Sequence, residues 1–222
     1  MRITFLFLTF FFNVALIAQS ADGYLIRMGD ISVINGNEDA AEVPIKYFPS
    51  GEWNSGVLYT INGSSIELEN VRLNLNTNEF EVKKGLHIFT AYKRQLKSLV
   101  INTPIASFVI ESRYVPELDE STLSNLITLY EGTSFRLFKA IKVLVKKPNF
   151  KPVLNTGSRN VSYSTKEYFV VENGNELFVL PSKKRKAKKM LERIIDDSSI
   201  VKSNKIDVSK EDDLVKLFKL LN

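Results

Sequence analysis

Residues 56–82, GVLYTINGSSIELENVRLNLNTNEFEV, carry the pattern that decides the fold. Apolar side chains occupy every second position, as at Val71, Leu73 and Leu75, and the positions between them are charged or polar. Successive side chains of a β-strand point to opposite faces of a sheet. This period of two therefore predicts strands that bury one face and expose the other.

Asn-Gly pairs separate neighbouring apolar runs at positions 62–63 and 173–174, the first of them inside the opening stretch. Both residue types tolerate the positive φ angles that a type I′ hairpin turn requires. We therefore expect two hairpins with such turns, over residues 57–68 and 168–180.

Further apolar runs raise the expected total to about ten short strands joined mostly by turns. They include residues 86–92, 96–101 and 105–111, and the runs on either side of expected turns at 76–78 and 131–133. Since no helical segment lies between the runs, the strands should pair in antiparallel fashion. Residues 148–165 contain two prolines, one glycine and no clear period, which predicts a long ordered loop or a boundary between lobes.

The apolar period changes to that of a helix after Pro181. Two apolar stripes follow at helical spacing: Ala187, Met190, Leu191, Ile194 and Ile195 in the first segment, and Leu214, Leu217, Phe218 and Leu221 in the second. Ser182 and Ser209 are the expected N-caps. The sequence thus predicts an α+β protein. Its antiparallel β-rich body over residues 21–180 is a sandwich or a curved sheet, and two C-terminal helices in residues 181–222 pack on it.

The first 20 residues have the pattern of a secretory signal peptide. One cation, Arg2, precedes an apolar run, and the small residues Ala18 and Ser20 fit a signal-peptidase site, so cleavage is expected after Ser20. A membrane anchor is the alternative, but a spanning helix needs roughly 20 apolar residues and this run is shorter. We therefore predict an exported protein of the periplasm or the cell surface, with no transmembrane span after cleavage.

The chain of 222 residues contains no cysteine, which excludes disulfides, thiol catalysis and thiolate zinc sites. Its formal net charge is +5, but the basicity is concentrated in one short stretch, residues 182–189, SKKRKAKK. Without that stretch the exported chain is slightly acidic. A whole-protein electrostatic argument for nucleic-acid binding therefore fails, and no nucleic-acid partner is predicted.

Six cations dominate this stretch, and we call them the basic patch: Lys183, Lys184, Arg185, Lys186, Lys188 and Lys189. They lie at the start of the first predicted helix, where the helix dipole disfavours positive charge, so helix stability does not explain them. Two interpretations remain. The patch is either a solvated face whose lysine stems cover apolar surface, or a binding surface for anionic lipid, an envelope polymer or an acidic protein partner.

The sequence contains none of the common catalytic motifs. The one histidine, His87, falls within a predicted strand, where a structural role is expected, and it cannot form a zinc site alone. Glu117, Asp119 and Glu120 could supply an acid and a base for glycoside cleavage, although acids in a turn are usually just solvated. No glycine-rich phosphate loop occurs. We predict no cofactor, no metal and no enzymatic activity.

Several stretches together resemble a group of uncharacterised secreted proteins of Bacteroidota. They are the hairpin stretch 56–82, the turn YEGTSFRLFKAIKV, the loop FKPVLNTGSRN, and the lysine-rich helix followed by KEDDLVKLFKLLN. The resemblance implies the same β-rich body and helical ending, and it assigns no activity and no site residue.

The residues and the resemblance together predict an exported, non-enzymatic binding or interaction protein of the cell envelope. Its ligand and its oligomeric state are left open. One alternative is a periplasmic carrier that shelters an apolar, lipid-like ligand between the sheet and the helices, which requires a cavity there. A less favoured alternative is an envelope hydrolase.

Overall fold

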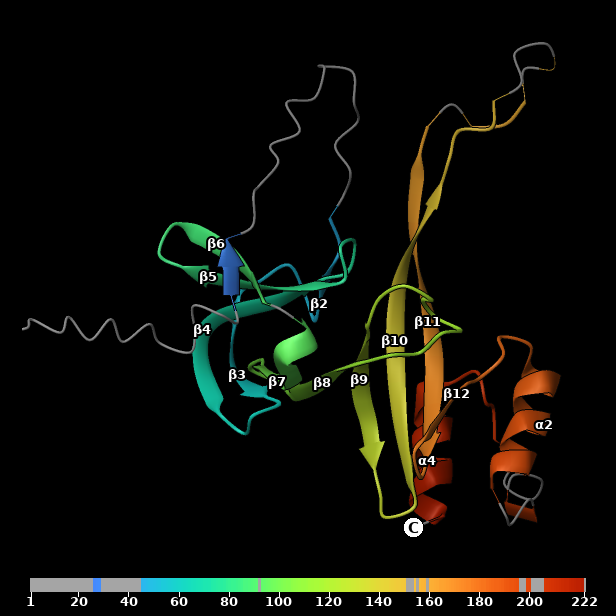
Figure 1. Cartoon of the computed structure of the whole chain (residues 1–222). Helices are drawn as coiled ribbons and strands as arrows, with labels where there is room; N and C mark the ends of the chain where they lie inside the picture. Colours follow the sequence, from blue (N-terminus) through green and yellow to red (C-terminus); the bar gives the residue numbers. More distant parts are fainter. Residues whose placement is uncertain are drawn as a thin grey trace, which may run out of the picture.

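A computed structural model describes residues 26–28, 45–91, 93–150, 154, 156–158, 160–195, 199–200 and 206–221. The predicted signal peptide and its cleavage site lie outside these residues. Within them the chain forms one antiparallel sheet with two C-terminal helices, as Figure 1 shows. The predicted α+β class is therefore confirmed.

Twelve strands lie within the described residues. They are β1 (Ile26–Met28), β2 (Tyr47–Phe48), β3 (Asn54–Thr60), β4 (Ser65–Asn74), β5 (Glu79–Lys84), β6 (His87–Ala91), β7 (Leu96–Asn102), β8 (Ser107–Arg113), β9 (Ser124–Glu131), β10 (Phe135–Lys146), β11 (Ser162–Asn173) and β12 (Glu176–Val179). Their order in the sheet is β1-β6-β5-β4-β3-β7-β8-β9-β10-β11-β12, and β2 pairs with β4. In Figure 1 β4 to β6 run roughly horizontally, whereas β10 and β11 run vertically. The strands belong to one sheet, so the body is one curved sheet rather than a sandwich.

One lateral row of side chains explains how the curved sheet is stabilised. Residues directly opposite each other in an antiparallel ladder share a face. The row passes through Leu58, Leu99, Ile110, Ile127, Lys139 and Phe169 on six neighbouring strands. Its first four residues belong to one hydrophobic core and Phe169 packs against a second core, so both cores lie on the same face.

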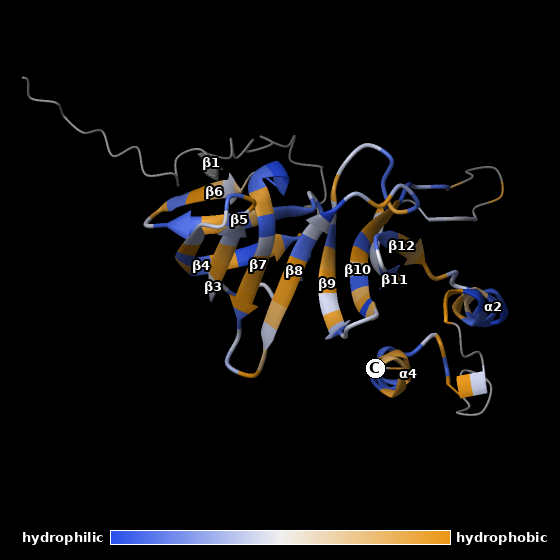
Figure 2. Cartoon of the chain, turned by 60° about the horizontal axis from the view of Figure 1, so that its bottom comes forward, coloured by the Kyte–Doolittle hydropathy of each residue, from blue (hydrophilic) through white to orange (hydrophobic). Residues whose placement is uncertain are grey.

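Two helices cover the second core, α2 (Lys184–Ile194) and α4 (Glu211–Leu220). Figure 2 shows both of them on one side of the end of the sheet that β9 to β12 form. The predicted apolar stripes are confirmed by their buried members: Ala187, Leu191 and Ile194 in α2, and Leu214, Leu217 and Phe218 in α4. Lys139 adds a polar link, because its Nζ lies 2.6 Å from the Glu211 carboxylate at the start of α4.

The predicted caps of both helices are wrong. The N-cap positions are Lys183 and Lys210, each one residue beyond the predicted serine, and neither forms a side-chain cap hydrogen bond. Ser209 instead donates its hydroxyl to Asp207 Oδ1 at 2.6 Å. At α4 a residue inside the helix contacts the preceding segment: the carboxylate of Asp213, in the first turn, accepts the backbone N–H of Asp207 at 3.0 Å.

Both predicted Asn-Gly hairpins are present, but their turns differ from the predicted type I′. Only the glycines have positive φ, 84° at Gly63 and 60° at Gly174. In the first hairpin the N–H of Gly63 donates to Thr60 O, so the glycine follows a tighter turn, as in a three-residue loop ending in a bulge. In the second hairpin Gly174 is the first central residue, the position that a type II′ turn reserves for glycine.

The expected loop at 148–165 is shorter than predicted, because β11 already begins at Ser162. The first residues of β11, Ser-Tyr-Ser-Thr, show no apolar alternation because they lie on an exposed part of the sheet. β10 and β11 form a twelve-pair ladder from Phe135↔Asn173 to Lys146↔Ser162. In Figure 1 the upper ends of these strands extend beyond the rest of the sheet.

Candidate binding surface

The basic patch lies at the start of α2, around the part of the helix that the second core does not cover. Lys183, Lys184, Arg185, Lys186 and Lys189 are exposed, and Lys188 is half-buried. Ala187, between these cations in sequence, is buried against the second core. In Figure 2, α2 is strongly hydrophilic over most of its surface. The structure therefore gathers the six predicted residues on one exposed surface.

One of the six cations has an acidic partner. Lys184 Nζ lies 2.7 Å from Asp207 Oδ2, in the segment before α4. The hydrogen bond from Lys184, and those from Ser209, hold the pKa of Asp207 well below its usual range. The other five cations form no ion pair with any residue that the structure describes. Their charge is therefore available to an external anion.

The carboxylates considered for hydrolysis lie in the connection between β8 and β9. Glu117 and Glu120 are exposed. Asp119 Oδ1 accepts the backbone N–H of Ser121 at 2.9 Å, and that of Thr122 at 3.1 Å. Hydrogen bonds from Ser121 and then Thr122 hold the pKa of Asp119 well below its usual range. A carboxylate that stays ionised in this way does not serve as a general acid near neutral pH, and Asp119 instead shapes the turn.

A polar pocket of about 220 Å³ lies beside this turn. Its lining includes Asp119, Asn78, Asn125 and the β10 residues 140–143. The two amides are committed to each other, because Asn125 Nδ2 donates to Asn78 Oδ1 at 2.9 Å. Asn78 Nδ2 in turn donates to Leu123 O. These hydrogen bonds join the β4–β5 turn to β9, so the pocket is best explained as the joint between two parts of the sheet.

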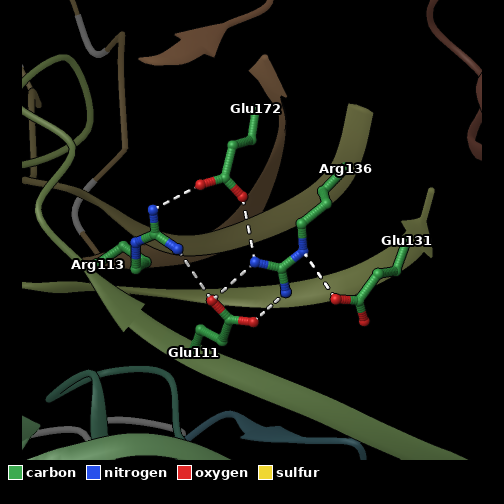
Figure 3. Close-up of polar contacts among 5 residues, drawn as sticks. All are labelled: Glu111, Arg113, Glu131, Arg136 and Glu172. Carbon is green, nitrogen blue, oxygen red and sulfur yellow. Dashed lines mark hydrogen bonds and ion pairs between the residues drawn. The ribbon is translucent and has the colours of Figure 1, made fainter. Parts of the chain in front are cut away.

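A second buried polar group lies on the opposite face of the sheet from the helices. Figure 3 shows Glu111 and Arg113 of β8, Glu131 of β9, Arg136 of β10 and Glu172 of β11 in one ion-pair network. Glu172 accepts from Arg113 Nη2 at 2.7 Å and from Arg136 Nη1 at 3.1 Å. Glu111 is bound by the same two guanidinium groups. Glu111 and Glu172 thus each have two arginine partners, whereas Glu131 contacts Arg136 alone.

The network lowers the cost of burying Arg136 and stabilises the junction of four strands. Burial lowers the pKa of Arg136, but the hydrogen bond from Arg136 to Glu111 and the charges of Glu111, Glu131 and Glu172 outweigh it, so the pKa is raised. The carboxylates of Glu111 and Glu172 are occupied by their contacts with the two guanidinium groups. The network is therefore structural. The sequence did not indicate it, since its members are far apart in the chain.

A second cationic surface lies on β10 and β11, and the sequence analysis missed it. No Asp or Glu occurs between Ala140 and Lys166, whereas six cations do: Lys142, Lys146, Lys147, Lys151, Arg159 and Lys166. Leu144 and Val145 between them are 38% and 56% exposed. The missing acids are a signal that the sequence does contain. This signal was missed because residues 148–165 were expected to form a loop or a boundary between lobes.

The remaining predicted residue, His87, lies exposed at the start of β6, with its ring 6.3 Å from that of Phe89. Over the described ranges, no three His, Cys, Asp or Glu side chains gather in a way that could hold a metal ion. No helix among those ranges is long and apolar enough to cross a bilayer.

Comparison with protein-family models, with curated proteins and with solved structures found no match for this chain. The arrangement of its own residues therefore carries the functional argument.

Proposed function

We propose that this is an exported, non-enzymatic binding protein of the cell envelope, which binds an anionic component through the basic patch of α2. One observation carries the proposal: four of the six cations, Lys183, Arg185, Lys186 and Lys189, stand exposed without an acidic partner in the part of the chain described by the structure. The apolar side of α2 is used up by the second core. Only the cationic side remains for a partner.

The location of the cations supports a binding role over a purely solvated face. The first turn of α2 contains no acid, although acids there would stabilise the helix. Lysine stems that cover apolar surface would account for a half-buried cation such as Lys188, but not for the four exposed cations that precede Ala187. An anion that bound these four would be attracted by their charge and by the helix dipole together.

The packing favours this surface over the carrier alternative. A carrier needs a cavity between the sheet and the helices, and small-molecule sites are typically roughly 300–1,000 Å³ in volume. That space is filled by fully buried side chains from both sides, among them Leu137, Val171, Leu191, Leu217 and Phe218. The pocket of about 190 Å³ beside the start of α2 has a mixed lining, which includes Phe169, Leu180 and Val208 as well as Lys166 and Lys184, and its volume is below that range.

The test is a charge-neutralising variant of the patch. With Lys183, Lys184, Arg185 and Lys186 changed to Gln, sedimentation of the mature protein with phosphatidylglycerol vesicles should fall sharply. Its thermal stability should stay near that of the wild type, because these side chains are exposed. Neutral phosphatidylcholine vesicles should sediment neither protein.

A matched control separates the patch from net charge. Changing the exposed cations Lys84, Arg94, Lys97 and Lys219 to Gln removes the same charge from other elements. This control should still sediment with the anionic vesicles. Equal loss in both variants would show that overall charge, not the patch, governs binding, and unchanged sedimentation of the patch variant would refute the proposal. The resemblance to secreted proteins of Bacteroidota and the export itself stay predictions. Sequencing of the mature N-terminus would test the predicted cleavage after Ser20.

A further inference from the structure

The outer half of the β10–β11 ladder is a two-stranded ribbon, residues 141–146 paired with residues 162–167. β9 pairs with β10 only up to Lys139, and β12 pairs with β11 only from Val170 onward. Among the described strands, the ribbon therefore has no other neighbour in the sheet. Ile141 and Val143 at its inner end pack against the first core, whereas residues 144–146 are exposed. A two-stranded ribbon without further packing is marginally stable in water, so the exposure of its outer end requires a reason beyond folding.

One face of the ribbon concentrates positive charge. Lys142 and Lys166 are directly opposite each other in the ladder, and Lys146 lies four pairs further out on the same face. Like charges directly opposite each other destabilise a strand pair. Lys166 stacks on Tyr168, with its Nζ 4.6 Å from the ring centroid, but none of the three lysines has an ion pair with a described acid.

The same ribbon exposes apolar side chains toward its outer end. Leu144 and Val145 are 38% and 56% exposed, and Val161 just beyond the ladder is 43% exposed. Tyr163, directly opposite Val145, is half-buried. Aromatic and aliphatic side chains flanked by lysines are the composition of surfaces that lie in the interface of a lipid bilayer.

Protection of open strand edges is a competing explanation for the lysines, because charged side chains on an edge prevent pairing with other chains. Lysine is the charged residue that natural proteins favour for that purpose, so the lysines alone do not exclude it. The chain contains 25 acids and 30 Lys plus Arg, so an unbiased stretch with six charges would hold about two or three acids, yet residues 140–166 hold none. Glu167, the one acid of the ribbon, is paired with Ile141 and lies on the face opposite the three lysines. Edge protection also does not require exposed Leu144 and Val145, so the positive charge of the lysine face is better explained by an anionic partner.

We propose that this ribbon docks on the surface of an anionic phospholipid bilayer. The outer end of the ribbon enters the headgroup boundary edge-on, because Leu144 and Val145 lie on its two opposite faces. Lys142, Lys146 and Lys166, on the face of Leu144, contact the anionic headgroups. Lys166 of the ribbon and Lys184 of the basic patch line one pocket, so the two surfaces adjoin. The two proposals are tested by separate variants, because no residue is changed in both.

Insertion is tested with a single labelled cysteine, which is straightforward because the chain has no cysteine of its own. An environment-sensitive fluorophore on V145C should shift to shorter wavelength when vesicles of phosphatidylglycerol and phosphatidylcholine are added. The same fluorophore on L86C should not shift, although Leu86 is 96% exposed and lies in the β5–β6 turn. No shift at position 145 while the protein sediments with the vesicles, or equal shifts at both positions, would overturn the proposal.

The charges are tested separately. Changing Lys142, Lys146 and Lys166 to Gln should lower the vesicle partition coefficient about 100-fold, since each lysine near an anionic surface contributes about fivefold. Changing the exposed Lys84, Lys97 and Lys219 to Gln removes the same charge elsewhere and should lower it less than about threefold. Circular dichroism should show both variants folded. Equal losses in the two variants would overturn the ribbon as the docking surface, as would binding of the ribbon variant at the wild-type level.

Discussion

The two halves of the β10–β11 ladder share one backbone pairing and have opposite environments. The inner half, residues 135–140 with 168–173, is buried by the helices on one face and by the β8–β9 connection on the other. Leu137 there is fully buried. The outer half is the ribbon, where Leu144 and Val145 stay largely exposed. The same two strands thus change from core to surface within a few residues.

The comparison separates what the ladder contributes from what side-chain packing contributes. Backbone hydrogen bonds continue through both halves, so they do not account for the difference. Burial of apolar area is the main favourable term in folding, and it is concentrated in the inner half, because in the ribbon only Ile141 and Val143 pack against a core. The inner half therefore anchors the ladder, whereas the surface of the ribbon is available for a partner.

The largest expected contrast comes from one substitution made at both ends of β10. L137A should lower the free energy of unfolding by about 2–5 kcal/mol, because it leaves a cavity between the sheet and the helices. L144A, seven residues further along the same strand, should lower it by less than about 1 kcal/mol, because the side chain is already 38% exposed. Urea denaturation of both variants measures the difference. Similar losses would show that the ribbon is as well packed as the inner half.

A smaller contrast involves two glutamates of β11. E172Q should lower the free energy of unfolding by about 3 kcal/mol, because it removes a 10% exposed partner of Arg113 and Arg136 from the ion-pair network. E167Q should lower it by less than about 1 kcal/mol. Glu167 is 53% exposed and lies 4.0 Å from Lys139, which keeps its closer partner Glu211.

Thermal unfolding followed by calorimetry distinguishes these two variants. If E172Q were as stable as the wild type, the network would contribute nothing to the junction of β8 to β11, and the inner half would depend on apolar packing alone. If E167Q were the more damaging change, Lys139 would depend on Glu167 rather than on Glu211.

Local signals in the sequence were enough to predict the hairpins and the buried stripes of both helices. An Asn-Gly pair between alternating runs, or leucines at helical spacing, acts over a few residues, and the same physical cause operates in the folded chain. The turn types and the helix caps were predicted less well. They depend on single φ angles and on single hydrogen bonds, such as the one from Ser209 to Asp207. Sequences of similar composition form different hydrogen bonds at such positions.

The sites depend on contacts between distant residues, and for that reason the sequence predicted only part of them. The basic patch is continuous in sequence, so its position at an exposed helix start was predictable. The ion-pair network joins Glu111 to Arg136 and Glu172, which only the strand order brings together. The ribbon exists because β9 and β12, with 8 and 4 residues, are shorter than the 12-residue strands beside them. No local pattern encodes a difference in length between neighbouring strands.

The smallest expected effect concerns the connection at the outer end of the ribbon. Gly157 has φ of 95°, and a Cβ there would lie 2.5 Å from the carbonyl oxygen of Asn149, whose N–H donates to Ser158 O at 2.9 Å. G157A should therefore destabilise this connection locally by about 1 kcal/mol or more, seen as faster hydrogen exchange of the Asn149 and Ser158 amides. The global free energy of unfolding should change by less than about 0.5 kcal/mol, because the anchoring contacts lie in the inner half. G51A is the control, since nothing lies within 4 Å of its added Cβ and exchange near the ribbon should stay as in the wild type. A loss of global unfolding free energy in G157A as large as that of L137A would mean that the ribbon and the inner half unfold as one unit. The two halves would then differ in exposure but not in stability.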